Sequence, residues 1–281
     1  MSVFVAGALH LDVVLQAPRL PRLDETLTGS AVHYVFGGKG GNQAVAAARM
    51  GADVAFAGRI GKDAFGATLR DTLLAADINI DQLQTDTGAS GMSAAIVDDH
   101  GDYGAVIVSA ANLGIEHDAI TIPPSTRLVL LQNEVPEVVN LSVAQKARQA
   151  GAKVWLNAAP ARQLSPDLLD AVDVFIVNRV EAAFYGSALP KAQTLTTLGP
   201  DGVQHGTDTH AGYAVDVVST HGAGDMFVGA LAAQVAGGAL IRDAIDFAQA
   251  AAALHVSLPV DARETLTPDR VARFRTGQPK R

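Results

Sequence analysis

The sequence predicts an α/β fold in which a doubly wound, mostly parallel sheet carries helices on both faces. Two observations predict it. Short apolar runs with a strand pattern alternate with helical windows along the 281 residues, an order typical of strand–helix–strand units. Polar residues follow several of these runs, and such folds bind ligands beyond the carboxyl ends of their strands. Because 48% of the residues are hydrophobic, the chain can build one large core, and we expect residues 1–281 to form a single domain.

The elements are identified in chain order from apolar runs and helical periodicity. The expected strands are residues 3–7, 53–58, 127–132, 153–157, 174–177 and 194–197. The expected helices are residues 43–50, 63–75, 138–150, 227–236 and 247–256. Since helices separate many of these strands, the connections are expected to cross over and the strands to pair in parallel.

Two segments do not fit this alternation. Residues 27–36, and residues 91–110 with a turn at 98–102, have the pattern of antiparallel strands. They predict a small β lid with segments at about residues 13–36 and 90–110, and an ordinary edge hairpin is the alternative. The pattern of residues 202–218 predicts another hairpin with its tip at 207–209. Residues 273–281 are expected to form a polar, basic tail.

Composition excludes several classes of function. The formal net charge of -8 argues against nucleic acid and anionic membranes as partners. The chain has no cysteine, which excludes disulfides, thiolate catalysis and Cys-based zinc sites. Residues 1–9 lack the basic start of a signal peptide, and no apolar run is long enough to span a bilayer. We therefore expect a cytoplasmic protein.

The glycine-rich segment 219–225, Ser-Thr-His-Gly-Ala-Gly-Asp, lies between the apolar run 213–218 and a helical pattern. A strand, a turn and a helix in this order leave backbone N–H groups unpaired at the helix start, where the helix dipole also favours an anion. Asp225 either caps the helix, or takes a proton from an acceptor while the N–H groups hold a transferring phosphoryl group.

A second glycine-rich segment, residues 36–43, reads Phe-Gly-Gly-Lys-Gly-Gly-Asn-Gln and also opens onto a helix. It is not a Walker A loop, because no Ser or Thr follows the lysine, and it is not the dinucleotide fingerprint. Two such turns, about 180 residues apart, suit two ligands that meet between them.

This pair of segments resembles the two signatures of the ribokinase-like (PfkB) carbohydrate kinases, and the first is closest in wording to the ribokinase branch. The resemblance runs from Gly7 to about Ala262. It implies an ATP-dependent sugar kinase that transfers the γ-phosphate to a hydroxyl of a pentose or related monosaccharide. It also implies a lid that closes over the sugar, and a homodimer formed through that lid.

The resemblance assigns residues to three parts of the site. Its catalytic residues are Asp225 as general base, with Gly222, Ala223 and Gly224 as the anion hole. Its sugar-binding residues are His10, Asp12, Gly38, Lys39, Asn42 and Glu134. Carboxylates, amides and ammonium groups suit vicinal hydroxyls, although Asp12 is alternatively a turn residue and Lys39 a solvated charge.

The nucleotide side depends on two further motifs of the family. Asn178 and Glu181 match its N-x-x-E motif, and Glu181 is expected to act on Mg²⁺ through water. Thr197 and Gly199 match its T-L-G turn. Gly202 and Gln249 complete the expected ATP site. On residue pattern alone, Asn178 and Glu181 form a helix capping box, and Gly202 serves backbone geometry.

The chain departs from the family pattern at several positions. Ser219 replaces an aspartate that helps to organise a potassium site, and residues 258–261 replace a glycine-containing loop that completes it. Both changes argue against K⁺ as a cofactor beside ATP and Mg²⁺. His10 replaces a sugar-binding asparagine, which puts strict ribose specificity in doubt. The segment 182–196 is about fifteen residues shorter than usual, so the sheet is expected to be locally uncovered.

Two other functions are weighed against the sugar kinase. A nucleoside kinase would use an aromatic lid face to stack a base, and the lid segments offer only Tyr34, Phe36 and Tyr103. A non-catalytic sugar- or nucleotide-binding protein would not need Asp225 together with the N-x-x-E motif. A metal site formed by His205, His210 and His221 beside Asp208 matches no zinc spacing, and exposed histidines are favoured there.

Overall fold

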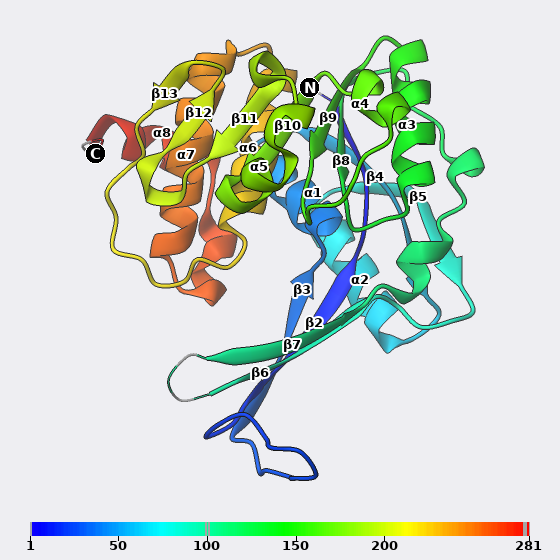
Figure 1. Ribbon diagram of the computed structural model, residues 1–281, viewed down its shortest axis with the longest axis vertical. Helices are drawn as coiled ribbons and strands as arrows, with labels where there is room; N and C mark the ends of the chain where they lie inside the picture. The colour runs from blue at the N-terminus through cyan, green and yellow to red at the C-terminus, as the bar shows by residue number, and fades with distance from the viewer. Residues whose placement is uncertain (1, 99, 101, 278–279, 281) are drawn as a thin grey trace.

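The computed structural model describes residues 2–98, 100, 102–277 and 280 (Figure 1). Within these residues, nine strands form the main sheet in the order β13-β12-β11-β10-β9-β8-β1-β4-β5. They are β1 (Ser2–Ala6), β4 (Asp53–Gly61), β5 (Asn79–Asp86), β8 (Thr126–Gln132), β9 (Lys153–Asn157), β10 (Val174–Asn178), β11 (Thr194–Thr197), β12 (Val203–His205) and β13 (Asp208–His210). The strands from β5 to β11 pair in parallel, and β12 and β13 are antiparallel. The predicted doubly wound sheet is confirmed.

Helices cover both faces of the sheet (Figure 1). One face carries α1 (Lys39–Arg49), α2 (Ala64–Ala75), α6 (Ala223–Ala236), α7 (Ile241–Ser257) and α8 (Pro268–Gly277). The other carries α3 (Glu137–Gln149), α4 (Pro166–Ala171) and α5 (Arg179–Tyr185). Along β1, Val3 and Val5 enter the first core, whereas Phe4 and Ala6 enter the second. Because successive side chains alternate between two covered faces, the central strands are apolar throughout.

A four-stranded sheet extends away from this body (Figure 1). Its order is β3-β2-β6-β7, formed by β2 (His10–Gln16), β3 (Ala31–Gly37), β6 (Met92–Val97) and β7 (Tyr103–Val108). The sequence predicted β3 and the β6–β7 hairpin. The strand at residues 10–16 was not among the expected strands, although residues 13–16 were placed within a lid segment. The strand β2 joins the two predicted parts, because it pairs with both β3 and β6.

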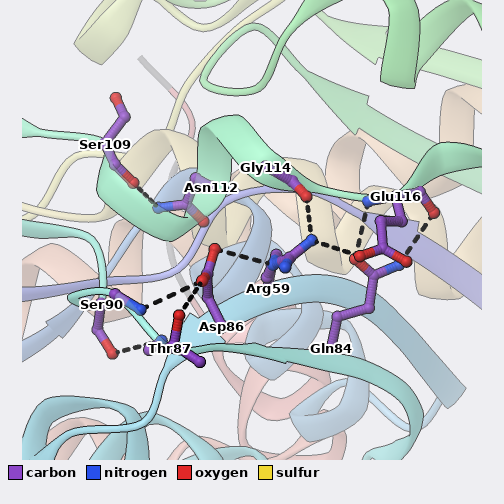
Figure 2. Close-up of polar contacts among 11 residues, drawn as sticks. Arg59, Gln84, Asp86, Thr87, Ser90, Ser109, Asn112, Gly114 and Glu116 are labelled. Atoms are coloured by element: carbon purple, nitrogen blue, oxygen red, sulfur yellow. Dashed lines mark hydrogen bonds and ion pairs between the residues drawn. The ribbon is translucent and has the colours of Figure 1, made fainter.

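Polar contacts fix the chain where it returns from this small sheet to the body (Figure 2). The short helix η1 (Ala110–Gly114) follows β7. Arg59 on β4 donates to the carbonyl of Gly114 and to the carboxylate of Glu116. The side chain of Gln84 on β5 bonds both the N–H and the carbonyl of Glu116, at 2.8 and 3.0 Å. The base of the small sheet is thereby tied to β4 and to the edge strand β5 of the main sheet.

The predicted strand at residues 213–218 is wrong. Over this segment the structure describes only a single bridge, between Tyr213 and Lys280. The N–H groups of Val218 and Ser219 instead donate to the carbonyl of Val256 at the end of α7, at 2.8 and 3.2 Å. The end of this segment is therefore bound to the end of α7 rather than to a neighbouring strand.

Two smaller expectations also need correction. The hairpin after β11 turns at residues 206–207 rather than 207–209, because β13 already begins at Asp208. Residues 273–277 are not a loose tail but the last turns of α8. There Arg275 donates to Asp246 from Nε at 2.8 Å and from Nη2 at 2.6 Å. A charge that looks generic in sequence has a specific partner on α7.

The short segment between α5 and β11 leaves part of the sheet uncovered, as predicted. It contains two short 3-10 turns, Gly186–Ala188 and Lys191–Gln193, in place of a further helix. A pocket of about 160 Å³ lies beneath them, and Val177, Thr194, Thr196 and Gln204 contribute to its walls. Among the helices that the structure describes, none is both long and apolar enough to cross a lipid bilayer.

Candidate active site

A pocket of about 240 Å³ lies at the carboxyl ends of β9, β10 and β11. Its walls contain eight of the residues that the sequence pointed to: Lys39, Asn178, Glu181, Thr197, Gly222, Ala223, Gly224 and Asp225. The starts of α1, α5 and α6 meet here, although their segments are up to 186 residues apart in the chain. The parallel topology therefore brings both glycine-rich segments to one edge of the sheet.

The first turn of α6 presents free backbone donors to this pocket. Gly222 caps the helix with φ 75°, and a Cβ built there would lie 3.1 Å from Nε2 of His255. The N–H of Met226 donates to the carbonyl of Gly222. Those of Gly224 and Asp225 donate to no backbone carbonyl in the described part of the chain. Unpaired N–H groups at a helix N-terminus form a site for an anion such as a phosphoryl group.

Asp225 is held from below by a relay of side-chain amides. Nε2 of Gln43, which is fully buried on α1, donates to Oδ1 of Asp225 at 2.9 Å and to Oδ1 of Asn157 at 2.9 Å. Oε1 of Gln43 accepts from Nε2 of Gln132, also at 2.9 Å. Because its acceptor atom is already occupied, Gln43 must turn its donors toward the carboxylate. Sequence reasoning stopped at Asn42, although an amide on an alanine-rich buried helix face was a signal.

Electrostatics make Asp225 a stronger base than an exposed aspartate. Burial raises the pKa of Asp225, and the positive charge of Lys39 is the largest of the effects that oppose this rise, followed by the hydrogen bond from Gln43. A carboxylate with a raised pKa accepts a proton more readily. Lys39 lines the same pocket as the start of α6 and so adds a positive charge to it.

The expected sugar residues lie between this pocket and the base of the lid. The carboxylate Oε2 of Glu134 accepts from the backbone N–H of Lys39 at 2.6 Å, and burial raises the pKa of Glu134. Asp12 on β2 accepts from Oγ of Ser93 on β6 at 2.5 Å. A Cβ at Gly37 would lie 2.3 Å from Asp12 Oδ2, so a larger residue there would displace this carboxylate from its present position. Asp12 is thus fixed to the lid strands.

His10, at the start of β2, is 4% exposed, and its Nε2 has no hydrogen-bond partner in the described structure. Burial lowers the pKa of His10 against the opposing effect of Asp12, so the ring is neutral at pH 7. Gly38 caps α1 with φ 83°, and a Cβ there would lie 2.6 Å from the carbonyl of Ala8. Asn42, one turn into α1, is half-buried.

Asn178 and Glu181 form a capping box at the start of α5, as their spacing alone predicts. Oδ1 of Asn178 accepts from the N–H groups of Val180 at 2.8 Å and Glu181 at 2.9 Å. Oε2 of Glu181 accepts from the N–H of Asn178 at 2.7 Å. Both residues also line the pocket. The capping role and a role toward ATP are therefore compatible, because Oε1 of Glu181 makes no bond to the described residues.

Three other expected nucleotide residues stand outside the walls of this pocket. Gly199, with φ 61°, is exposed. A Cβ at Gly202, with φ 100°, would lie 2.0 Å from the carbonyl of His210, so this glycine is needed for the turn itself. Gln249 on α7 is 7% exposed, and neither end of its amide has a hydrogen-bond partner among the described residues.

The donors in the pocket fit a magnesium ion that is held largely by other ligands. Glu181 offers one oxygen, and the described residues contain no group of three His, Cys, Asp or Glu side chains arranged to hold a metal. Magnesium commonly takes one or two carboxylates and completes its octahedron with phosphates and water. The site is suited to a metal that arrives with a nucleotide.

Comparison with known proteins relates this chain to carbohydrate kinases in both sequence and fold. A model of the pfkB family of carbohydrate kinases matches residues 1–263. Ribokinase of Bacillus subtilis is 32% identical over 271 residues, which cover 91% of this chain and 92% of that protein. Arabidopsis thaliana ribokinase, solved in complex with ribose and ATP, aligns with TM-score 0.85 at 25% identity over 97% of this chain and 98% of that one. A nucleoside kinase of Methanocaldococcus jannaschii shares the fold, with TM-score 0.84 at 16% identity over 98% of both chains.

Proposed function

The chain belongs to the pfkB family of carbohydrate kinases, and we propose that it transfers the γ-phosphate of ATP to a hydroxyl of ribose or a closely related pentose. One observation carries the proposal. Asp225, held by Gln43, stands beside the free N–H groups of α6 and shares the pocket with Lys39. A base, an anion site and a cation in one pocket are what phosphoryl transfer to an alcohol requires.

In the proposed mechanism, Asp225 accepts the proton of the attacking sugar hydroxyl. The hydroxyl oxygen forms a bond to the γ-phosphorus as the bond to the β–γ bridging oxygen breaks, and ADP leaves. The N–H groups of Gly224 and Asp225 and the α6 dipole stabilise the charge on the transferring group. Gln43 keeps the carboxylate directed at the hydroxyl. Lys39 reduces the negative charge that the phosphates bring into the pocket.

We assign the polyphosphate of ATP to the wall of the pocket formed by the start of α5 and the end of β11. Asn178, Glu181 and Thr197 line this wall, and Gly199 and Gly202 shape the turn that follows β11. Magnesium, when bound, would neutralise part of the phosphate charge, with Glu181 contacting its water shell. Gln249 is proposed as a residue of the adenine side. Each of these roles rests on the family motifs, together with the arrangement of these residues around one edge of the sheet.

The sugar is assigned to the space between Lys39 and the lid, where Asp12, Glu134 and Asn42 supply acceptors and donors for its hydroxyls. A neutral, buried His10 adds one hydrogen-bonding nitrogen and more bulk than asparagine. Closure of the lid would exclude water and so limit hydrolysis of ATP. We keep a cytoplasmic location as a further prediction from the sequence.

A test of the proposed function is ADP release from ATP and magnesium across pentoses, hexoses and nucleosides. Turnover with ribose or another pentose, well above every nucleoside, is the expected result. Turnover with nucleosides alone would replace the sugar kinase with a nucleoside kinase, a function that the shared fold also accommodates. Binding of a sugar without any ADP release would favour a non-catalytic binding protein.

A further inference from the structure

A buried arginine lies behind the glycine-rich segment 219–225, on the side away from the pocket. Arg263 belongs to the short helix η6 (Val260–Thr265) and is 6% exposed. Its Nη1 donates to the carbonyl of His221 and its Nη2 to the carbonyl of Ser219, both at 3.0 Å. One guanidinium therefore bridges two carbonyls on the loop that leads into the anion site.

The charge of Arg263 is balanced by these carbonyls and not by a carboxylate. In the described part of the chain, neither an ion pair nor a nearby charge compensates it, and burial alone lowers the pKa of Arg263. An arginine remains protonated in proteins, and burying its charge is costly unless dipoles or counter-charges face it. The loop carbonyls are thus arranged around a permanent positive charge.

This arrangement also determines where the loop N–H groups point. In a trans peptide the carbonyl and the following N–H point in opposite directions. The carbonyls of Ser219 and His221 face Arg263, so the N–H groups of Thr220 and Gly222 face away from it. Both of these residues line the pocket. The cation behind the loop therefore orients donors in front of it.

The carbonyl of His221 receives one other donor, Nε2 of His255 at 2.9 Å. Burial lowers the pKa of His255 to about 4, so this ring is neutral near pH 7 and donates through Nε2–H. Arg263 is consequently the one full positive charge that hydrogen-bonds to these carbonyls among the described residues.

Potassium, which the family resemblance implies at this loop, does not fit the residues present. A hard cation needs several oxygen ligands. Here the carbonyls of Ser219 and His221 already accept from Arg263, and Ser219 brings no carboxylate. The residues that replace the family's glycine-containing loop, Leu258 to Asp261, lead into η6 and so deliver the arginine.

We propose that Arg263 serves as a built-in cation that holds the segment 219–225 in its anion-binding conformation, so that the protein needs no alkali cation there. The inference deepens the proposed kinase function and rests on it. Arg263 is a positioning residue: it is not among the residues that line the pocket, and it acts through the loop carbonyls.

The first test compares the wild-type protein in potassium chloride and in tetramethylammonium chloride at equal ionic strength. We expect kcat, MgADP affinity and melting temperature to agree between the salts, the first two within about twofold. A stimulation by potassium of about tenfold or more, in rate or in MgADP affinity, would overturn the proposal. A protein that binds MgADP equally in both salts but phosphorylates no sugar would refute the proposed function and leave the inference standing.

The second test removes the charge. Arg263→Ala is expected to weaken MgADP binding and lower kcat by about tenfold or more in tetramethylammonium, with the sugar KM nearly unchanged. Added potassium or guanidinium should restore much of the loss, which a merely structural role would not predict. Arg273→Ala, at an exposed position of α8, is the matched control. Unchanged MgADP affinity and kcat in Arg263→Ala would contradict the proposal.

A third variant keeps the experiment decisive if Arg263→Ala does not fold. Arg263→Lys retains a positive charge but has one compact donor group in place of the fork. We expect it to melt cooperatively and to remain independent of potassium, with MgADP affinity below that of the wild type. Activation of the lysine variant by potassium would show that charge at this position does not replace the alkali cation.

Discussion

At the scale of single residues, the carboxylates of the site are held in position by hydrogen bonds from neutral amide groups. Asp225 gains basicity from burial, yet it keeps its orientation through Gln43. The motif made Asp225 and Lys39 predictable, because each stands in a recognisable glycine-rich segment. It could not reveal the relay through Gln132 or the role of Arg263, because these depend on contacts that span about 90 and about 40 residues of sequence.

Replacement of Gln43 by leucine tests the amide relay. The change removes the donor to Asp225 while keeping a similar volume, so we expect kcat to fall by about 10–100-fold with a small change in sugar KM. The hydrogen bond from Gln43 lowers the pKa of Asp225. Its loss should raise that pKa, and the acidic limb of the pH–rate profile should move to higher pH, because the base must be deprotonated to act.

The matched control for this prediction is Gln204→Leu, an exposed amide on β12, the strand next to the edge strand β13. It should leave both kcat and the pH profile unchanged. Two outcomes would show that the relay does not position the base: a Gln43→Leu enzyme with wild-type kcat, or an acidic limb that moves to lower pH.

At the scale of elements, most strands of the main sheet and most long helices were predictable to within a few residues, whereas β5, α4, α8 and the irregular segments were not. The strand β9 was predicted with its observed bounds, Lys153–Asn157, because a strand buried on both faces has a continuous apolar pattern. Residues 213–218 have a similar pattern, but Val217 and Val218 are more than half exposed and the segment bonds to the end of α7. Composition alone does not say which partner an apolar segment finds.

The N-terminus of α6 depends on the left-handed backbone of Gly222. Gly222→Ala is expected to cost about 1–2 kcal/mol in the free energy of unfolding, since a Cβ is strained at this φ, and the added atom would also press on His255. MgADP affinity should fall as well, because the N–H groups that follow are displaced. Chemical denaturation and calorimetric titration measure the two effects.

Gly224→Ala provides the comparison for stability, because a Cβ there meets no atom within 4 Å and the backbone is already helical. It should leave the free energy of unfolding unchanged or slightly raised. If the two substitutions destabilise the protein equally, the left-handed conformation of Gly222 is not what shapes the start of the helix.

At the scale of the whole molecule, the body and the lid supply different residues to the proposed site. The parallel sheet brings the residues that we assign to the nucleotide and to catalysis to one edge, and the small sheet carries Asp12, which we assign to the sugar. The lid also exposes apolar side chains, among them Tyr34, Val106 and Ile107, each more than 60% exposed. The side chain of Tyr103 lies outside the described part. A surface of this kind is typical of a contact with another chain.

We therefore propose that two lids pair in a homodimer, and Ile107→Asp tests it. Sedimentation velocity at micromolar concentration should give a dimer for the wild type and a monomer for the variant, because the charge would be buried at the contact. Leu74→Asp, at an exposed position on α2 away from the lid, should remain dimeric. A monomeric wild-type protein would contradict the proposal.

The central claim, that Asp225 is the base of a sugar kinase, is tested most directly by a single-turnover measurement with ribose, ATP and magnesium. Wild-type protein should form one ADP and one phosphorylated sugar per site. Asp225→Asn keeps the volume and the bond from Gln43, and it should form product about 10²–10⁴-fold more slowly while binding ribose and MgADP with nearly unchanged affinity. Product formation at the wild-type rate by Asp225→Asn would contradict the account, because the proton of the sugar hydroxyl would then have to go elsewhere.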